Sequence, residues 1–196
     1  MNTHKTTVEI WSDFRCPFCY IADTLLQKLQ SELKDSVQIE IVRHAYELYP
    51  DAMRHSDSTI LDSYAKRYGL TRAEAEKKVD AISEYGRRVG IVNFNYGGAV
   101  PTNTFDAHRL AKYAAEQGVD GMYERLMYAY FCDNVNIGDR DVLLSIAQEM
   151  GLNPGATDLM LLNNKFAQAV RNDERQAMQL DIRSIPCFYV DGNQFV

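Results

Sequence analysis

Two kinds of hydrophobic spacing follow each other at the start of the chain, and their order restricts the folds open to it. Residues 6–12 (TTVEIWS) are rich in β-branched and aromatic side chains, which predicts a strand. The next apolar residues recur at helical spacing and form one stripe: Ile21, Leu25, Leu29 and Leu33. Apolar and polar residues then alternate over residues 37–41, which predicts a second strand. A strand, a crossover helix and a strand of these lengths form a parallel pair with a right-handed connection.

The sequence Cys-Pro-Phe-Cys, from Cys16 to Cys19, joins the first strand to the helix. Pro17 suits the first helical turn, where its missing N–H is not needed. Cys16 is therefore expected at the helix N-terminus, where free backbone N–H groups and the helix dipole favour a thiolate. Cys19 is expected one turn into the helix and more deeply buried, and it can attack a mixed disulfide formed on Cys16. Strand, dithiol and helix thus stand in the order that thiol–disulfide exchange needs.

Two cysteines at this spacing also fit half of a metal site, or a pair with no function. A structural zinc site usually needs a second close pair of cysteines, or two closely spaced histidines, to complete its ligands. Cys132 and Cys187 are isolated, and the four histidines are scattered. We therefore expect no metal site, since one would need ligands that converge from distant parts of the chain.

Composition limits the class of protein. A chain of 196 residues with 46% hydrophobic residues can form one substantial core, with room for an inserted subdomain. The net charge is -6 and no basic stripe is present, so nucleic-acid binding has little support. No apolar run approaches the roughly 18–20 residues of a membrane span. The start lacks the apolar segment of a signal peptide, which predicts a cytoplasmic protein. In that compartment paired cysteines indicate redox catalysis or metal binding more than a structural disulfide.

The middle of the chain, residues 57–182, is predicted to be almost entirely helical. The expected capping residues are Thr71 with Glu74, Thr104 and Asp139, and the expected helix ends are at Gly118 and Gly151. Residues 183–196 then give a strand, an Asp191-Gly192 turn and the start of another strand, which predicts a hairpin. The chain is therefore divided into a βαβ part (residues 1–56), a helical insertion (residues 57–182) and a C-terminal hairpin that looks incomplete (residues 183–196).

Four motifs in this order resemble one known family. They are WSDFRCPFCY, NTFDAHRLAKYA, YFCDNVNIGDRDVL and the closing SIPCFYVDG. Together they are similar to the DsbA family of thioredoxin-fold oxidoreductases. The closest branch is the FrnE-like one, which is related to 2-hydroxychromene-2-carboxylate isomerases and kappa-class glutathione transferases. The resemblance covers nearly the whole chain. It implies an α/β thioredoxin fold, βαβ then a β-hairpin, with a large all-helical insertion.

The resemblance also implies the roles of the site residues. Cys16 is the attacking thiol, Cys19 the resolving thiol, and the Ile185–Pro186 bond is cis, in a loop that faces the dithiol and binds an extended substrate. The implied function is that of a thiol–disulfide oxidoreductase or isomerase of protein or peptide disulfides. No cofactor beyond the dithiol is implied. A reductant or oxidant resets the dithiol, and glutathione is one candidate for that redox partner.

The related branches supply the alternatives. The isomerases and transferases generally carry a serine where Cys16 stands, and a serine cannot form a disulfide. Both cysteines together favour dithiol exchange over a glutathione-dependent isomerase or transferase, and over a non-catalytic or metal-binding module. Asn103 and Thr104 match a loop that helps to bind ligand in those relatives. Capping of the following helix is the simpler interpretation of both residues.

Several residues near the motifs allow two interpretations. Trp11 and Phe14 flank the motif and are interpreted as an apolar rim that receives substrate, and Trp11 has a second interpretation as part of the core at the end of the strand. His108 is expected at the surface or between lobes, and Cys132 is expected to be a buried, unreactive thiol. Cys187 stands where relatives more often have Phe or Thr. It is either a small apolar residue on a buried strand or a third thiol close to the dithiol.

The sequence ends within the second strand of the hairpin. The resemblance calls for that strand to finish and for a final helix to cover the sheet. A bare sheet face and an unpaired edge strand favour aggregation. We therefore expect the native polypeptide to continue beyond Val196. The alternative is a homodimer in which a partner subunit covers the bare face.

Overall fold

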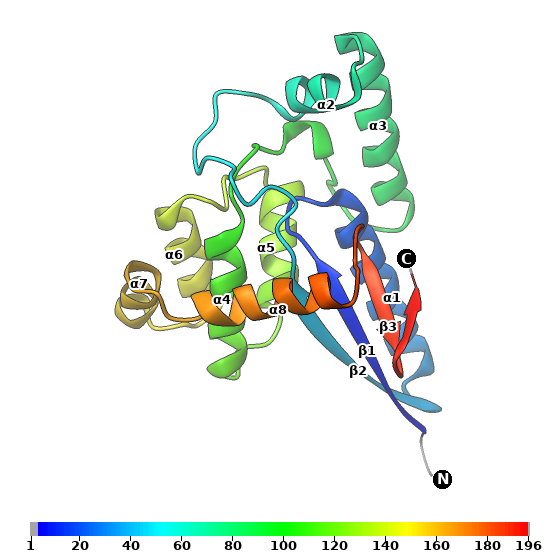
Figure 1. The fold of residues 1–196 in the computed structure, drawn as a ribbon, viewed down its shortest axis with the longest axis vertical. Coiled ribbons are helices and arrows are strands. Elements are labelled where there is room, and N and C mark those ends of the chain that lie inside the picture. Colours follow the sequence, from blue (N-terminus) through cyan, green and yellow to red (C-terminus); the bar gives the residue numbers. More distant parts are fainter. Residues whose placement is uncertain (1–3, 196) are drawn as a thin grey trace.

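A computed structural model describes residues 4–195 and contains one four-stranded sheet with the order β2-β1-β3-β4 (Figure 1). β1 (His4–Ser12) runs parallel to β2 (Val37–Ala45) along its whole length. β3 (Cys187–Val190) is antiparallel to β1, and β4 (Asn193–Phe195) is antiparallel to β3 at the sheet edge. The predicted parallel pair and closing hairpin are confirmed. The predicted continuation after Val196 lies outside the described residues.

Eight α-helices and one short 3-10 helix are present in residues 4–195. They are α1 (Pro17–Leu33), α2 (Ile60–Tyr68), α3 (Arg72–Arg88), the 3-10 helix η1 (Tyr96–Gly98), α4 (Phe105–Glu116), α5 (Met122–Phe131), α6 (Arg140–Glu149), α7 (Pro154–Leu162) and α8 (Ala167–Gln179). All but α1 lie between β2 and β3 in the chain, and the segment from α3 to α4 is irregular apart from η1. Over the described part of the chain, no helix has the length and apolar character needed to cross a membrane.

Two of the three predicted helix caps are confirmed, among them Asp139, whose carboxylate accepts from the backbone N–H groups of Asp141 and Val142 at the start of α6. Thr71 and Glu74 form the predicted capping box of α3, in which each side chain accepts a hydrogen bond from the backbone N–H of the other. Thr104 stands at the N-cap of α4 but makes no capping hydrogen bond with its side chain, so that prediction is wrong. Asn103 does this instead, because its Oδ1 accepts from the Phe105 N–H at 2.9 Å.

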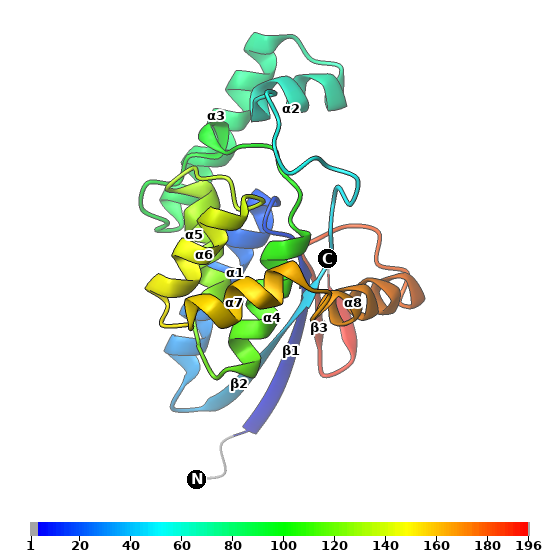
Figure 2. The same ribbon diagram turned by 90° about the vertical axis from the view of Figure 1, so that its left-hand side faces the viewer.

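Alternating side chains of β1 face two different helices. Val8 packs with Leu26 of α1 and with Ile39 of β2. Trp11 points to the other side, where it packs with Ala177 of α8. Since successive residues of a strand face opposite sides of a sheet, α1 and α8 cover its two faces, as Figures 1 and 2 show.

The largest core continues from the first turns of α1 into the inserted helices. It contains Cys19 and Tyr20 of α1 together with buried residues of α3, α4, α5, α6 and α7. At its centre Tyr20 stacks on Phe131 of α5, and Phe131 stacks on Phe94. Full burial of an aromatic or aliphatic side chain stabilises a fold by about 1.5–3 kcal/mol. The N-terminal end of α1 is therefore fixed by packing against the helical part of the chain.

Candidate active site

Cys16 is the N-cap residue of α1. Its backbone is extended (φ -89°, ψ 110°), and its sulfur accepts a hydrogen bond from the Cys19 N–H at 3.3 Å. Pro17 occupies the first turn, as predicted. A backbone N–H that points at the sulfur, at the positive end of the helix dipole, stabilises a thiolate. Cys16 is 4% exposed and borders a cleft.

Cys19 lies one turn further along α1 and is fully buried. Burial raises the pKa of its thiol well above the ordinary value, and the neighbouring Cys16 raises it further. Both cysteines are free thiols in this structure. Because burial penalises the charged form of a thiol, Cys19 is held in its protonated form. The pair can therefore offer Cys16 as the nucleophile at the cleft and keep Cys19 as a buried thiol for a second step.

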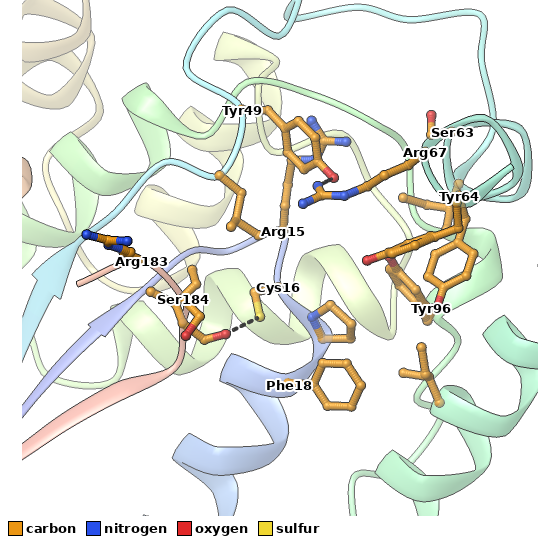
Figure 3. A pocket seen from close by; sticks show the side chains of 16 residues that line it. Arg15, Cys16, Phe18, Tyr49, Ser63, Tyr64, Arg67, Tyr96, Arg183 and Ser184 are labelled. Carbon is orange, nitrogen blue, oxygen red and sulfur yellow. Dashed lines mark hydrogen bonds between the residues drawn. The ribbon is translucent and has the colours of Figure 1, made fainter. Parts of the chain in front are cut away.

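The loop before β3 lies against Cys16. The Ile185–Pro186 peptide bond is cis, as the family resemblance implies. The Ile185 carbonyl accepts a hydrogen bond from the Cys16 Sγ at 3.8 Å, drawn as a dashed line in Figure 3. Two segments 169 residues apart in the chain thus meet at the Cys16 sulfur.

A cleft of about 310 Å³ opens beside Cys16. Its walls come from the start of α1, the loop after β2, helices α2 and α3, η1 and the loop before β3 (Figure 3). The aromatic side chains that line it are Phe18, Tyr49, Tyr64, Tyr68 and Tyr96. Sequence reasoning missed all of them. Phe18, between the two cysteines, was the one with a local signal, whereas the tyrosines reach the cleft only through the packing of α2, η1 and the loop after β2.

Trp11 and Phe14 do not form a rim around the dithiol, and that interpretation is wrong. Trp11 is 0% exposed, stacks on His44 at a centroid distance of 4.2 Å and donates its indole N–H to the Asp173 carbonyl at 3.2 Å. Phe14 is also 0% exposed and packs against His108 and Tyr123. Trp11 is turned toward α8, and Phe14 lies under the helices, so neither side chain reaches solvent.

Asn103 and Thr104 line neither the cleft nor the dithiol. The Asn103 amide donates to Glu47 Oε1 at 3.1 Å and to the Pro50 carbonyl at 3.0 Å, in addition to capping α4. Thr104 is 2% exposed. Their contacts fix the start of α4, which supports the capping interpretation for Asn103 and gives no support to a ligand loop.

Asp13 and His108 form a buried pair that sequence reasoning did not identify. Asp13 is 0% exposed, and its carboxylate accepts from the Leu48 N–H at 2.7 Å and the Arg15 N–H at 3.3 Å. His108 is 4% exposed, so of its two expected positions the surface is wrong. It lies between α4 and the N-terminal part of the chain, with its Nε2 3.5 Å from Asp13 Oδ1. Burial by itself would raise the pKa of Asp13, but His108 and the hydrogen bonds to the carboxylate bring it below the ordinary value.

Cys187 belongs to a different apolar cluster from the dithiol, and Cys132 packs at the edge of the cluster that contains the dithiol. Cys187 is 0% exposed and packs with Trp11 and Ala177 on the α8 side of the sheet, whereas Cys16 and Cys19 belong to the core on the α1 side. This placement supports the interpretation of Cys187 as a small buried residue over that of a third thiol. Cys132 is half-buried, and burial raises its pKa to about 11. Over residues 4–195, no three His, Cys, Asp or Glu side chains are grouped as metal ligands would be.

Comparison with known proteins gives a consistent result. Residues 7–196 match the family described as DSBA-like thioredoxin domain. The Bacillus subtilis (strain 168) uncharacterized protein YwbO is 26% identical over 190 residues, which cover 93% of this chain and 86% of YwbO. The crystal structure of a probable DsbA oxidoreductase from Streptomyces coelicolor has a TM-score of 0.89 at 26% identity and covers 97% of this chain and 82% of its own. The structure of a 2-hydroxychromene-2-carboxylate isomerase has a TM-score of 0.69 at 14% identity. The match covers 96% of this chain and 87% of the isomerase, which therefore shares the fold.

Proposed function

The chain belongs to the DSBA-like thioredoxin domain family, and from this premise we propose that it is a thiol–disulfide oxidoreductase of protein or peptide disulfides. The observation that carries the proposal is the position of Cys16. Its sulfur lies at the N-terminus of α1, accepts the Cys19 N–H and meets the Ile185 carbonyl at the edge of an open cleft. A structural pair of cysteines would need neither the helix terminus nor the cleft.

Exchange through this pair takes two displacement steps. The Cys16 thiolate attacks one sulfur of a substrate disulfide, so that a mixed disulfide forms and the first substrate thiolate leaves. Cys19 then loses its proton and attacks the Cys16 sulfur, so that the Cys16–Cys19 disulfide forms and the second substrate thiolate leaves. Two electrons have moved from the enzyme to the substrate, and the two thiol protons end on the products. The reverse sequence oxidises a substrate dithiol.

The burial of Cys19 fits the second step. Its raised pKa keeps it protonated while Cys16 reacts with substrate. Once Cys16 is in a mixed disulfide it no longer carries a charge, and the electrostatic cost of ionising Cys19 falls. In this proposal the backbone of Ile185 and Pro186 binds the extended substrate next to Cys16. The proposal also includes a cytoplasmic location and a small thiol, such as glutathione, as the redox partner.

The test has two parts. Equilibration of the protein in glutathione redox buffers, followed by alkylation and mass measurement, gives the potential of the Cys16–Cys19 pair. A value near about -120 mV indicates an oxidase or isomerase and one near about -270 mV a reductase. The Cys19→Ser variant is expected to accumulate mixed disulfides on Cys16, and Cys16→Ser is expected to accumulate none. Mixed disulfides on Cys19 in the second variant, or a pair that never oxidises, would contradict the proposal.

A glutathione-dependent isomerase or transferase is the second candidate, and one observation favours it. The cleft of about 310 Å³ has the size of a small-molecule site. Such an enzyme needs no resolving thiol. Conversion of a 2-hydroxychromene-2-carboxylate by Cys19→Ala at the wild-type rate would support this candidate. No conversion by either protein would exclude that substrate.

A further inference from the structure

The cleft beside Cys16 carries two guanidinium groups that converge on one tyrosine (Figure 3). The Arg15 guanidinium lies 4.1 Å from the centroid of the Tyr49 ring, and the Arg67 guanidinium lies 5.1 Å from it. Arg15 also donates to the Thr102 carbonyl at 3.2 Å, and Arg67 donates to the Tyr49 hydroxyl. These contacts hold both cations next to the reactive thiol and leave other N–H donors of each group free.

Neither cation has a carboxylate partner. Most of the other arginines form ion pairs, as Arg43 does with Asp23, but within residues 4–195 neither Arg15 nor Arg67 does. Arg15, Arg67 and Arg183 line the cleft, and no Asp or Glu does. Arg183 is paired with Asp181 outside the lining, so the unpaired charge belongs to Arg15 and Arg67. A chain with a net charge of -6 thus concentrates uncompensated positive charge beside its nucleophile.

The positive surface extends past the cleft. A second, more open pocket shares Arg15, Tyr49 and Arg67 with the first and adds Lys66, and no acidic residue lines it either. Unpaired cations attract anionic substrates and repel cationic ones. Unpaired arginines beside Cys16 therefore indicate a site that discriminates between substrates by charge.

We propose that Arg15 and Arg67 select disulfide substrates that carry a carboxylate close to the reacting sulfur. The planar guanidinium group matches a carboxylate with two parallel hydrogen bonds, and the two groups lie at the edge of a cleft of small-molecule size. This inference rests on the proposed function and names its substrate class. The reaction is the exchange described above, in which the reduced dithiol converts the disulfide to two thiols and becomes the Cys16–Cys19 disulfide.

Three disulfides of similar size test the charge preference of the reduced protein. They are 3,3′-dithiodipropionate (anionic), bis(2-hydroxyethyl) disulfide (neutral) and cystamine (cationic). Each oxidation rate is divided by the rate of the same disulfide with dithiothreitol, which removes the intrinsic reactivity of the compound. The anionic disulfide is expected to react roughly five- to tenfold faster than the neutral one, and the cationic one is expected to be slowest. The preference is expected to weaken as salt is added.

Two variants assign the preference to the cleft. Arg67→Gln is expected to remove most of the advantage of the anionic disulfide, and Arg15→Gln is expected to do the same. Arg88→Gln is the matched control, because Arg88 also lies near a tyrosine ring, at 5.8 Å from Tyr85, but does not line the cleft. It removes one positive charge and is expected to leave the preference intact.

The outcomes separate the two proposals. Equal normalised rates for the three disulfides, or a preference that Arg67→Gln leaves unchanged, would overturn the charge selection and leave dithiol exchange standing. The same holds if Arg88→Gln reduces the preference as much as Arg67→Gln does, because the effect would then come from net charge. Failure of the reduced protein to react with any of the three disulfides would defeat the proposed function and this inference with it.

Discussion

Cys16 and Cys19 are only one helical turn apart, yet their surroundings differ. The Cys16 sulfur borders the cleft and accepts a backbone N–H, whereas Cys19 is enclosed by the core beneath it. Desolvation makes a buried thiolate costly, so burial alone can assign different roles to two chemically identical groups. The N–H that stabilises Cys16 belongs to Cys19, so the helix itself couples the pair.

Alkylation as a function of pH tests this difference. A short pulse of iodoacetamide at pH 7 is expected to label Cys16 and leave Cys19 unmodified. Because the pKa of Cys19 is raised well above its ordinary value, its labelling is expected to begin only at strongly alkaline pH. Peptide mapping by mass spectrometry identifies the labelled thiol. Labelling of Cys19 before Cys16 would reverse the two roles.

Asp13 supplies a prediction about acid stability. Its pKa is below the ordinary value of 3.8 in the folded state, so its charge stabilises the fold at higher pH. That stability is lost as the pH falls below 3.8 and through the folded-state pKa. Asp13→Asn is expected to lower the free energy of unfolding at pH 7 by about 1–3 kcal/mol. It is also expected to flatten the dependence of stability on pH between 4 and 2.

Urea denaturation of the wild type and of Asp13→Asn between pH 7 and pH 2 measures the free energy of unfolding and its dependence on pH. The matched control is Asp141→Asn, which changes an exposed carboxylate in the first turn of α6. Its effect is expected to stay within about 0.5 kcal/mol. An equally steep loss of stability in Asp13→Asn and wild type would show that Asp13 is not the responsible group.

At the scale of elements, helix α3 is held to the core by a close approach of its backbone to an aromatic ring. A Cβ atom built on Gly86 would lie 2.3 Å from the Phe94 ring. Phe94 in turn packs on Tyr20 and Phe131 under the start of α1. The absence of a side chain at Gly86 therefore lets α3 pack closely against the aromatic cluster under α1.

Substitution of Gly86 by alanine is expected to destabilise the protein. Glycine to alanine in a helix normally stabilises by about 0.5–1 kcal/mol, but the clash with Phe94 has the opposite sign and costs about 1–3 kcal/mol. The control is Gly155→Ala in α7, where the added Cβ would meet only the Asn153 side chain at 3.5 Å. Thermal unfolding of both variants is expected to show a lower midpoint for the first and an unchanged or higher one for the second. A stabilised Gly86→Ala would mean that Phe94 moves aside freely.

At the scale of the whole molecule, the largest apolar cluster joins the start of α1 to the inserted helices. The cluster that contains Cys16 and Cys19 continues into α3, α4, α5, α6 and α7, and α8 covers the second face of the sheet. A separately folding helical domain would need its own enclosed core. The packing instead indicates that the sheet and the inserted helices depend on each other for stability.

Trp11 allows a direct test of this dependence. It is the single tryptophan of the chain and is buried in β1, so its fluorescence reports on the sheet. Far-UV circular dichroism reports mainly on the helices. The two signals are expected to change at the same urea concentration, as in one cooperative transition. A dichroism transition that precedes the fluorescence transition would show that the inserted helices unfold by themselves.

Local patterns in the sequence determined the elements and the central chemistry. The spacing of Ile21, Leu25 and Leu29 predicted the helix, and Pro17 placed Cys16 at its start. These inferences succeeded because helix periodicity and capping depend on residues within a few positions of each other. The cis bond before Pro186 came from the family resemblance, since no local pattern specifies it.

Tertiary structure alone decided which side chains reach the reactive sulfur. Trp11 and Phe14 stand beside the motif in the sequence, yet packing against α8 and α5 buries both. Arg67 and Tyr49 come from segments tens of residues away and line the cleft next to Cys16. Burial and proximity depend on how distant segments pack, and a single sequence records that packing only indirectly. The position of the two cysteines was therefore predictable from the sequence, whereas the side chains that line the cleft beside Cys16 were not.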